Sequence, residues 1–284
     1  METIIKKAAI LIEAIPYIHD FRHKVFVIKY GGSILHDDKI RHNVLQDIVF
    51  LSVVGIKVIL VHGGGPQIST RMKEAGIKTE FVDGIRVTDE ATLKIVGEEL
   101  NKLNEQIVSE IKVLKGDVTG LKGEENLIQV KKRKAAKDLG FVGTITKVDR
   151  VAIEDHLKRG YITVVSPMGI SGTNQLHNIN ADEVSYAIAN TLAAEKLVLM
   201  TDVPGVLRDK HDKESLISTL KLSEVESLIE QGVIQGGMIP KVNSCVEAIQ
   251  AGVRKAHIVD ARLQHALLLE FFTNKGIGTQ IIPD

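Results

Sequence analysis

The chain has 284 residues, of which 44% are hydrophobic, so it is long enough to bury one large core or the cores of two lobes. Its 36 basic and 36 acidic residues give a formal net charge of zero, which offers no support for nucleic-acid binding or for attachment to an anionic membrane surface. The single cysteine, Cys245, excludes an internal disulfide and a cysteine-based zinc site, and we expect it to be a small buried residue. No apolar run reaches the roughly 20 residues of a membrane-spanning helix.

The first 21 residues, METIIKKAAILIEAIPYIHDF, place two lysines before an apolar run, as signal peptides do. Because Glu13 interrupts that run and no small-residue cleavage site follows, we interpret the segment as a helix of the mature protein. Its apolar residues recur at helical spacing and form one stripe, made of Ile4, Ala8, Leu11, Ile12 and Ile15. Such a stripe packs either on its own domain or on another chain.

From residue 25 onward, short aliphatic strands alternate with helical segments. We expect strands at 25–29, 57–61, 162–166, 196–201 and 255–260, and helices at 37–54, 66–76 and 90–114. This alternation is typical of a parallel sheet covered by helices on both faces. Residues 117–148 break the pattern and predict a β-hairpin insertion rich in Val, Ile and Thr. We interpret its basic run KKRK as a solvated face, because no aromatic residues alternate with the charges.

Three consecutive glycines, Gly63 to Gly65, follow the strand at 57–61 and precede Pro66, which suits the first turn of a helix. Glycine backbone at a helix N-terminus lets amide N–H groups approach an anion closely. The pattern matches neither of the common glycine-rich nucleotide motifs. An esterase oxyanion loop would need a G-x-S-x-G nucleophile, which the chain lacks. A tight turn and an anion site both remain open interpretations.

A second glycine turn follows the strand at 25–29, where Lys29 precedes Gly31 and Gly32. Ligands of open parallel sheets bind at the carboxyl ends of the strands, so both glycine turns should face one crevice. A lone lysine is usually a surface charge. At the end of an apolar strand, beside bare backbone, it suits a phosphoryl group.

Three further stretches place polar side chains at the ends of elements. They contribute Arg86 in DGIRVTDE, then Asn178, Asn180 and Asp182 in LHNINADEV, and Lys241 in GGMIPKV. Taken singly, Asp182 would only complement a helix dipole and Lys241 would be a surface charge. Together they are the richest set of candidate site residues, and the chain offers no Ser-His-Asp, HExxH or cysteine-based alternative.

Six motifs in this order closely resemble those of the N-acetyl-L-glutamate kinases of the amino-acid kinase family: KYGGS, VHGGGPQI, DGIRVTDE, NINADEVSYAIA, TDVPGVL and GGMIPKV. The first turn is shared with aspartate, glutamate, carbamate and uridylate kinases, whereas the combination of the next three motifs is narrower. The resemblance implies a three-layer αβα sandwich with a mainly parallel central sheet. It also implies ATP-dependent phosphorylation of the side-chain carboxylate of N-acetylglutamate in arginine biosynthesis. A glutamate or aspartate kinase, or a regulatory protein without turnover, remains the alternative.

The same resemblance implies roles for individual residues. Lys29 and Lys241 resemble the lysines that stabilise the transferred phosphoryl group, Asp182 the acid that orients them, and Gly32 a backbone donor to that group. The implied acetylglutamate contacts are Gly64, Gly65, Arg86 and Asn178, with Asn180 in support. Gly64 also resembles an amide that faces the phosphoryl group. ATP is expected near TDVPGVL, with Mg²⁺ bridging its phosphates and no metal ligand from the protein.

Arginine-inhibited members of the family resemble this chain in two further features. One is an extra N-terminal helix that interlaces dimers into a hexamer, a trimer of dimers, and the other is a C-terminal H…EFFT…GIGT pattern. The resemblance therefore implies L-arginine feedback through Glu270, His265 and Gly276, with Glu270 on the guanidinium group.

The implied organisation is an oligomerisation helix at 1–22, an acetylglutamate-binding lobe at 23–180, and a lobe at 181–284 for ATP and the regulatory arginine. Arginine-sensitive members of photosynthetic lineages also bind the PII signal protein, which makes PII a candidate partner. The expected location is the cytoplasm, or the plastid stroma for a plastid-encoded gene.

Overall fold

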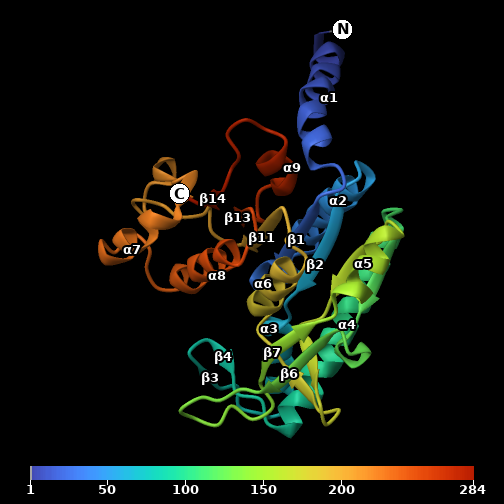
Figure 1. Cartoon of the computed structure of the whole chain (residues 1–284), viewed down its shortest axis with the longest axis vertical. Coiled ribbons are helices and arrows are strands. Elements are labelled where there is room, and N and C mark those ends of the chain that lie inside the picture. Colours follow the sequence, from blue (N-terminus) through green and yellow to red (C-terminus); the bar gives the residue numbers. More distant parts are fainter. Residues whose placement is uncertain (1) are drawn as a thin grey trace.

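The computed structural model describes residues 2–284, apart from a few side chains near the N-terminus and in two loops. Its centre is an eight-stranded sheet with the order β12-β14-β13-β11-β1-β2-β8-β5 (Figure 1). All neighbouring strands in it are parallel except β13 and β14, as expected. The strands are β1 (Val25–Tyr30), β2 (Lys57–His62), β5 (Val118–Leu121), β8 (Ile162–Val165), β11 (Lys196–Thr201), β12 (Thr219–Lys221), β13 (Lys255–Asp260) and β14 (Thr279–Ile282).

Helices cover both faces of this sheet, which confirms the three-layer αβα architecture. One hydrophobic cluster joins the sheet to α2, α4 and α9, and another joins its opposite face to α5, α6, α7 and α8. The helices are α1 (Glu2–Phe21), α2 (Asp38–Val53), α3 (Gly65–Glu74), α4 (Glu90–Val113), α5 (Arg150–Lys158), α6 (Ala181–Thr191), α7 (Leu222–Glu230), α8 (Met238–Gln250) and α9 (Ala266–Phe271).

Strand β1 shows how the sequence places a charged group in the crevice. Successive side chains of a strand point to opposite faces. Phe26 and Ile28 belong to the cluster with α2 and α4, and Val27 to the cluster with α6. Lys29, two residues after Val27, therefore emerges on the α6 face, at the carboxyl end of the strand.

A smaller sheet with the order β10-β9-β6-β7 lies below the main one in Figure 1 and carries the expected hairpin. Its strands are β6 (Ile128–Lys132), β7 (Gly143–Val148), β9 (Met168–Ser171) and β10 (Leu176–Asn178). The prediction of an insertion from residue 117 was wrong at its start, because β5 pairs in parallel with β8 in the main sheet. Four residues, one of them glycine, give too short a pattern to identify such an edge strand. A two-stranded ribbon, β3 (Phe81–Val82) with β4 (Ile85–Arg86), lies beside the small sheet.

Helix α1 projects away from the body of the protein (Figure 1), as a continuous helix. Of the expected apolar stripe, Leu11 and Ile12 are 67% and 66% exposed and Ile15 is also exposed, while the side chains of Ile4 and Ala8 lie outside the described part. The end of the helix is anchored by the Phe21 ring, which packs edge-on against three other phenylalanine rings. Within residues 2–284, no helix is long and apolar enough to cross a membrane.

Two histidines are buried in the main sheet, His62 at the end of β2 and His257 in β13. Burial disfavours the charged imidazolium and lowers the pKa of each to about 4. Both rings are therefore neutral at pH 7, whereas they would titrate near pH 6.5 in the unfolded chain.

We expect these histidines to make the protein less stable in acid. The unfolded chain binds the protons first, so the free energy of unfolding falls as the pH decreases from about 6.5 towards 4. Each histidine should contribute a loss of about 2 kcal/mol between pH 7 and pH 5. Urea unfolding of the wild type and of His62→Asn at both pH values measures how much of the loss in unfolding free energy comes from His62. An equal loss in the two proteins would contradict the prediction.

Candidate functional site

Lys29 of β1 and Asp182 of α6 meet at the carboxyl end of the central strands. The Lys29 Nζ lies 2.9 Å from the Asp182 Oδ1, and the two side chains are 15% and 25% exposed. Helix α6 begins here because Asn180 is its N-cap and its side-chain oxygen accepts a hydrogen bond of 2.8 Å from the Asp182 N–H. Three residues that the sequence singled out are thus brought together, with Asn180 fixing the helix turn that carries the carboxylate.

The two glycine turns touch each other through their backbones. A Cβ on Gly31 would lie 3.2 Å from the Gly63 Cα, and one on Gly64 would lie 2.7 Å from a Leu100 methyl group. Gly32 has φ 83° and ψ −156°, a conformation that is essentially restricted to glycine. Side chains would therefore separate the turns or block the surface between them, so the glycines leave bare backbone facing the crevice.

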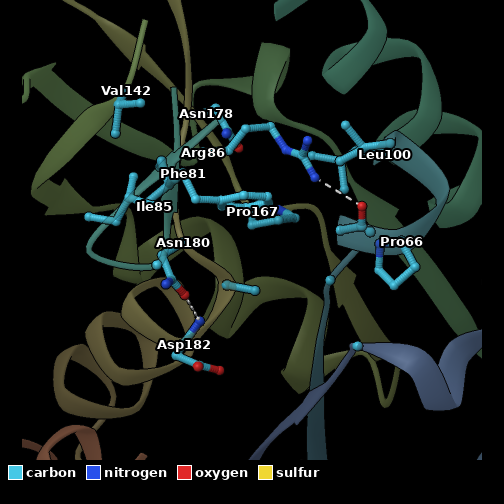
Figure 2. A pocket seen from close by; sticks show the side chains of 18 of the residues that line it. Pro66, Phe81, Ile85, Arg86, Leu100, Val142, Pro167, Asn178, Asn180 and Asp182 are labelled. Atoms are coloured by element: carbon cyan, nitrogen blue, oxygen red, sulfur yellow. Dashed lines mark hydrogen bonds between the residues drawn. The ribbon is translucent and has the colours of Figure 1, made fainter. Parts of the chain in front are cut away.

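A cavity of about 260 Å³ opens over these turns (Figure 2). It is lined by eight of the predicted site residues: Lys29, Gly32, Gly64, Gly65, Arg86, Asn178, Asn180 and Asp182. Figure 2 shows Asp182 on one side of it and the guanidinium group of Arg86 on another. The remaining lining includes apolar side chains that the sequence did not identify, among them Phe81, Ile85, Val142 and Pro167.

Arg86 is only 6% exposed, and burial lowers its pKa. Its Nη2 donates to the Gly65 carbonyl at 2.9 Å and to the Ser69 hydroxyl at 2.8 Å, and the guanidinium carbon lies 4.7 Å from the centre of the Phe81 ring. No carboxylate pairs with it in the part of the chain that the structure describes. A buried cation held by neutral groups favours binding of an anion from outside.

Asn178 lies at the end of β10, and its amide Nδ2 donates to the Thr88 hydroxyl at 3.2 Å. Thr88 in turn donates to the Arg86 carbonyl at 2.9 Å, so the hydroxyl connects two predicted site residues. The sequence interpretation missed Thr88, although it lies within the DGIRVTDE motif. The sequence around Phe81 contains no pattern that would have identified this residue as part of the site, because a strand of two residues has no recognisable periodicity.

Lys241 does not line the cavity. It lies in the first turn of α8, and its Nζ donates to the Gly237 carbonyl at 3.3 Å. Helix α8 nevertheless packs beside α6. Burial, assisted by the Asp182 charge, raises the pKa of Cys245, which lies one turn after Lys241 and is buried as expected. The lysine thus lies on a helix that packs beside α6, with its ammonium group turned back to the start of its own helix.

The three predicted arginine-site residues fall in two places. Gly276, with φ 63°, lies against the Glu270 carboxylate. A Cβ added at Gly276 would lie 2.8 Å from a Glu270 oxygen. His265 instead binds the buried Asp47 of α2, with its Nδ1 2.7 Å from the Asp47 Oδ1. That contact attaches the start of α9 to α2 and depends on residues 218 apart in the chain, which the sequence pattern does not connect.

Glu270 itself belongs to a buried polar cluster that the sequence interpretation did not identify. Its carboxylate accepts from His257 Nδ1 at 2.7 Å and from two backbone N–H groups, and these donors outweigh its burial and lower its pKa. Lys196 Nζ lies 3.1 Å from His257 Nε2 and faces the Phe21 ring at the end of α1. Burial lowers the pKa of Lys196 to about 8.

Comparisons with known proteins identify the family of the chain. The Amino acid kinase family pattern matches residues 24–260. The acetylglutamate kinase of Desulforamulus reducens is 48% identical over 283 residues, which cover 99% of each chain.

Two solved structures of N-acetylglutamate synthase from Neisseria gonorrhoeae have similar folds, each at 26% identity. The complex with coenzyme A and N-acetyl-glutamate has a TM-score of 0.87 over 98% of this chain, and the complex with coenzyme A and L-arginine has 0.84 over 97%. Our chain spans 63% and 65% of the length of those chains. The family pattern, the fold and the near-full-length similarity together place the chain in the amino acid kinase family, as a member of its acetylglutamate kinases.

Proposed function

We propose that the protein transfers the γ-phosphoryl group of ATP to the side-chain carboxylate of N-acetyl-L-glutamate, giving N-acetyl-L-glutamyl 5-phosphate for arginine biosynthesis. The observation that carries the proposal is the single cavity with two differently built ends. One end has the Lys29–Asp182 pair and bare glycine backbone, and the other has a buried Arg86 without an acidic partner. A dianionic acceptor would bind between them.

The reaction needs little proton chemistry. The attacking carboxylate, with an ordinary pKa near ~4.3, is already ionised at pH 7, so no general base is required. Its oxygen forms a bond to the γ-phosphorus while the bond from that phosphorus to the bridging oxygen breaks, and ADP leaves. Catalysis then consists of alignment and charge stabilisation. Lys29 and the Gly32 and Gly64 amides supply positive charge and donors to the phosphoryl group, and Asp182 holds the Lys29 ammonium in place.

The nucleotide would lie towards 181–284, near residues 201–207, where β11 ends. The part of the cavity around Lys29 and the glycine turns suits a triphosphate, because the lysine and the glycine backbone offer hydrogen-bond donors without side-chain obstruction. Mg²⁺ would be held through the nucleotide phosphates and would offset their charge. Lys241 would complete the site by turning from Gly237 towards the phosphates when the nucleotide binds.

The acceptor end would recognise N-acetylglutamate by charge and shape. Arg86 would bind the α-carboxylate bidentately, and Asn178 would hydrogen-bond to the polar groups at the same end. Backbone of Gly64 and Gly65, which lines the cavity, would lie between this end and the phosphoryl end, and Asn180 supports Asp182 as the cap of α6. The apolar wall around Phe81 would accept the acetyl methyl group, which glutamate and aspartate lack.

The reaction is tested by an ATP-dependent hydroxamate assay with N-acetylglutamate, glutamate and aspartate. We expect turnover with the acetylated acceptor and little with the other two. Because Lys29 stabilises the moving phosphoryl group, Lys29→Ala should lower kcat by about 10²–10³-fold. Failure of the wild type to phosphorylate N-acetylglutamate would refute the proposal.

Arg86→Leu tests the acceptor end. Loss of the charged contact should raise the KM for N-acetylglutamate about 10–100-fold, since a hydrogen bond to a charged group contributes about 1.5–3 kcal/mol. The KM for ATP should stay within about twofold. Arg71→Leu is the matched control, because Arg71 is half exposed on α3 and does not line the cavity. Equal effects of the two substitutions on the acceptor KM would argue against the assignment.

We also propose feedback inhibition by L-arginine at the cluster around Glu270. Glu270 would pair with the guanidinium group, and Gly276 would allow the ligand to approach the backbone. Lys196 offers a cation for the α-carboxylate, and its position beside Phe21 connects the cluster to α1. His265 would act indirectly, by attaching α9 to α2 through Asp47. The similar fold of the arginine-bound synthase supports this proposal.

The exposed stripe on α1 would then bind the same helix of another subunit. Its isoleucines and leucine are exposed on a helix that projects from the body of the protein, which suits the interlacing that joins three dimers into a hexamer. PII is a candidate partner of such a ring. The bacterial origin of the relatives favours the cytoplasm over the plastid stroma as the place of the reaction.

Arginine regulation is tested with Glu270→Gln and with a chain that lacks residues 1–20. Both should lose most of the inhibition by arginine while keeping kcat within about threefold, because neither change reaches the cavity. The shortened chain should also elute as a dimer in size-exclusion chromatography with light scattering. A shortened chain that stayed hexameric and fully inhibited would contradict the role of α1, and full inhibition of Glu270→Gln would contradict the site.

A further inference from the structure

His62 is fully buried directly before the three glycines, and both of its ring nitrogens have partners. Its Nδ1 lies 3.1 Å from the carbonyl oxygen of Gly63. Its Nε2 lies 3.2 Å from the Ser166 Oγ and 3.2 Å from the Asn104 Nδ2, and the Asn104 amide also donates to the Val164 carbonyl. The ring is thus held by Asn104 of α4 and by Ser166, directly after β8, while its other edge contacts the glycine turn.

The partners determine which nitrogen carries the proton. A carbonyl oxygen can only accept, so the Nδ1 must be the N–H donor to Gly63. The Nε2 is then the acceptor, and both Ser166 and Asn104 have hydrogens to donate to it. Burial lowers the pKa of His62 to about 4, so the ring keeps this neutral form at neutral pH.

The bond to Gly63 also determines where the next amide points. In a trans peptide the C=O and N–H groups point in opposite directions, and the chain has no cis peptide bond. With the Gly63 carbonyl directed at the buried ring, the Gly64 N–H points to the other side, and Gly64 lines the cavity. In the described part of the chain the Gly64 N–H has no acceptor, so it is free to bind an anion.

We propose that His62 is a positioning residue that, through the Gly63 carbonyl, holds the Gly63–Gly64 peptide with its N–H towards the phosphoryl group. The inference rests on the proposed phosphoryl transfer. Without the ring N–H, the carbonyl would be a buried acceptor without a donor, and glycine would permit the peptide to rotate. A rotated peptide would direct its carbonyl oxygen at the transferring group and repel its negative charge. His62 thereby contributes to the transition state although it touches neither substrate.

Two substitutions separate the roles of the ring nitrogens. His62→Asn places an amide nitrogen close to the position of the Nδ1 and keeps the bond to Gly63, whereas His62→Gln places its amide near the Nε2 and loses that bond. Because one fixed backbone donor contributes about 10²–10³-fold to kcat in other enzymes, we expect His62→Gln to lose about 30-fold in kcat. The KM values should change by less than about threefold, and His62→Asn should stay within about fivefold of the wild-type kcat.

Thr163→Val is the matched control. Thr163 is fully buried in β8 of the same sheet, and its hydroxyl has no hydrogen-bond partner, so its removal should leave kcat unchanged. Ser166→Ala is a further variant that leaves His62 itself in place. Loss of one donor to the Nε2 should lower kcat about threefold.

The outcomes distinguish the positioning role from the proposed function. Wild-type turnover of N-acetylglutamate tests the function, and its absence would overturn both. With an active wild type, equal kcat values for His62→Asn and His62→Gln would overturn only the positioning role, as would a loss that falls on KM instead of kcat. If His62→Gln proved unstable by thermal unfolding, an unchanged kcat of Ser166→Ala would overturn the role by itself.

Discussion

The contact on which the site depends is the backbone-to-backbone approach of two glycine turns at the ends of adjacent strands. Strands β1 and β2 are paired in register from Val25 with Lys57 to Tyr30 with His62, so the turns that follow them start side by side. The Gly63 N–H donates to the Tyr30 carbonyl at 2.9 Å, which closes the gap between them. Only residues without a Cβ can lie this close. The arrangement presents a surface of backbone amides that both anions of a phosphoryl transfer, the acceptor carboxylate and the phosphate chain, could approach.

The distribution of charge around this surface follows from the reaction. A carboxylate nucleophile needs no base. In the described part of the chain, the only histidine that contacts the glycine turn is His62, which is buried and neutral. The charged groups serve other purposes. Lys29 is held by Asp182, whereas in the described part of the chain Arg86 contacts neutral groups and a ring, so an acceptor bound as we propose would meet one neutralised and one available cation. This asymmetry would favour binding of the acceptor in a single orientation.

The sequence predicted those parts of the protein that local patterns determine. Aliphatic runs located β1, β2, β8, β11 and β13, and the Asn-Ile-Asn-Ala-Asp stretch located the start of α6, since these are properties of neighbouring residues. The parts that it missed depend on distant contacts. The four-residue β5 is a strand because β8 lies beside it, and Phe81 belongs to the site because a ribbon of two short strands places it on Arg86. His265 and Asp47 likewise meet only in the folded chain.

One strand also connects the proposed regulatory cluster to the proposed catalytic centre. Phe26 pairs in register with Lys196 of β11, and its ring packs against Phe21 of α1 and Phe271 of α9. Three residues further along β1 is Lys29, about 10 Å away at the rise of an extended strand. A ligand that displaces Phe21 must therefore repack around Phe26, and because cores are densely packed the shift is not absorbed locally. Regulation and catalysis would share β1 as a contiguous physical element, with α1 able to act on Lys29 without approaching the cavity.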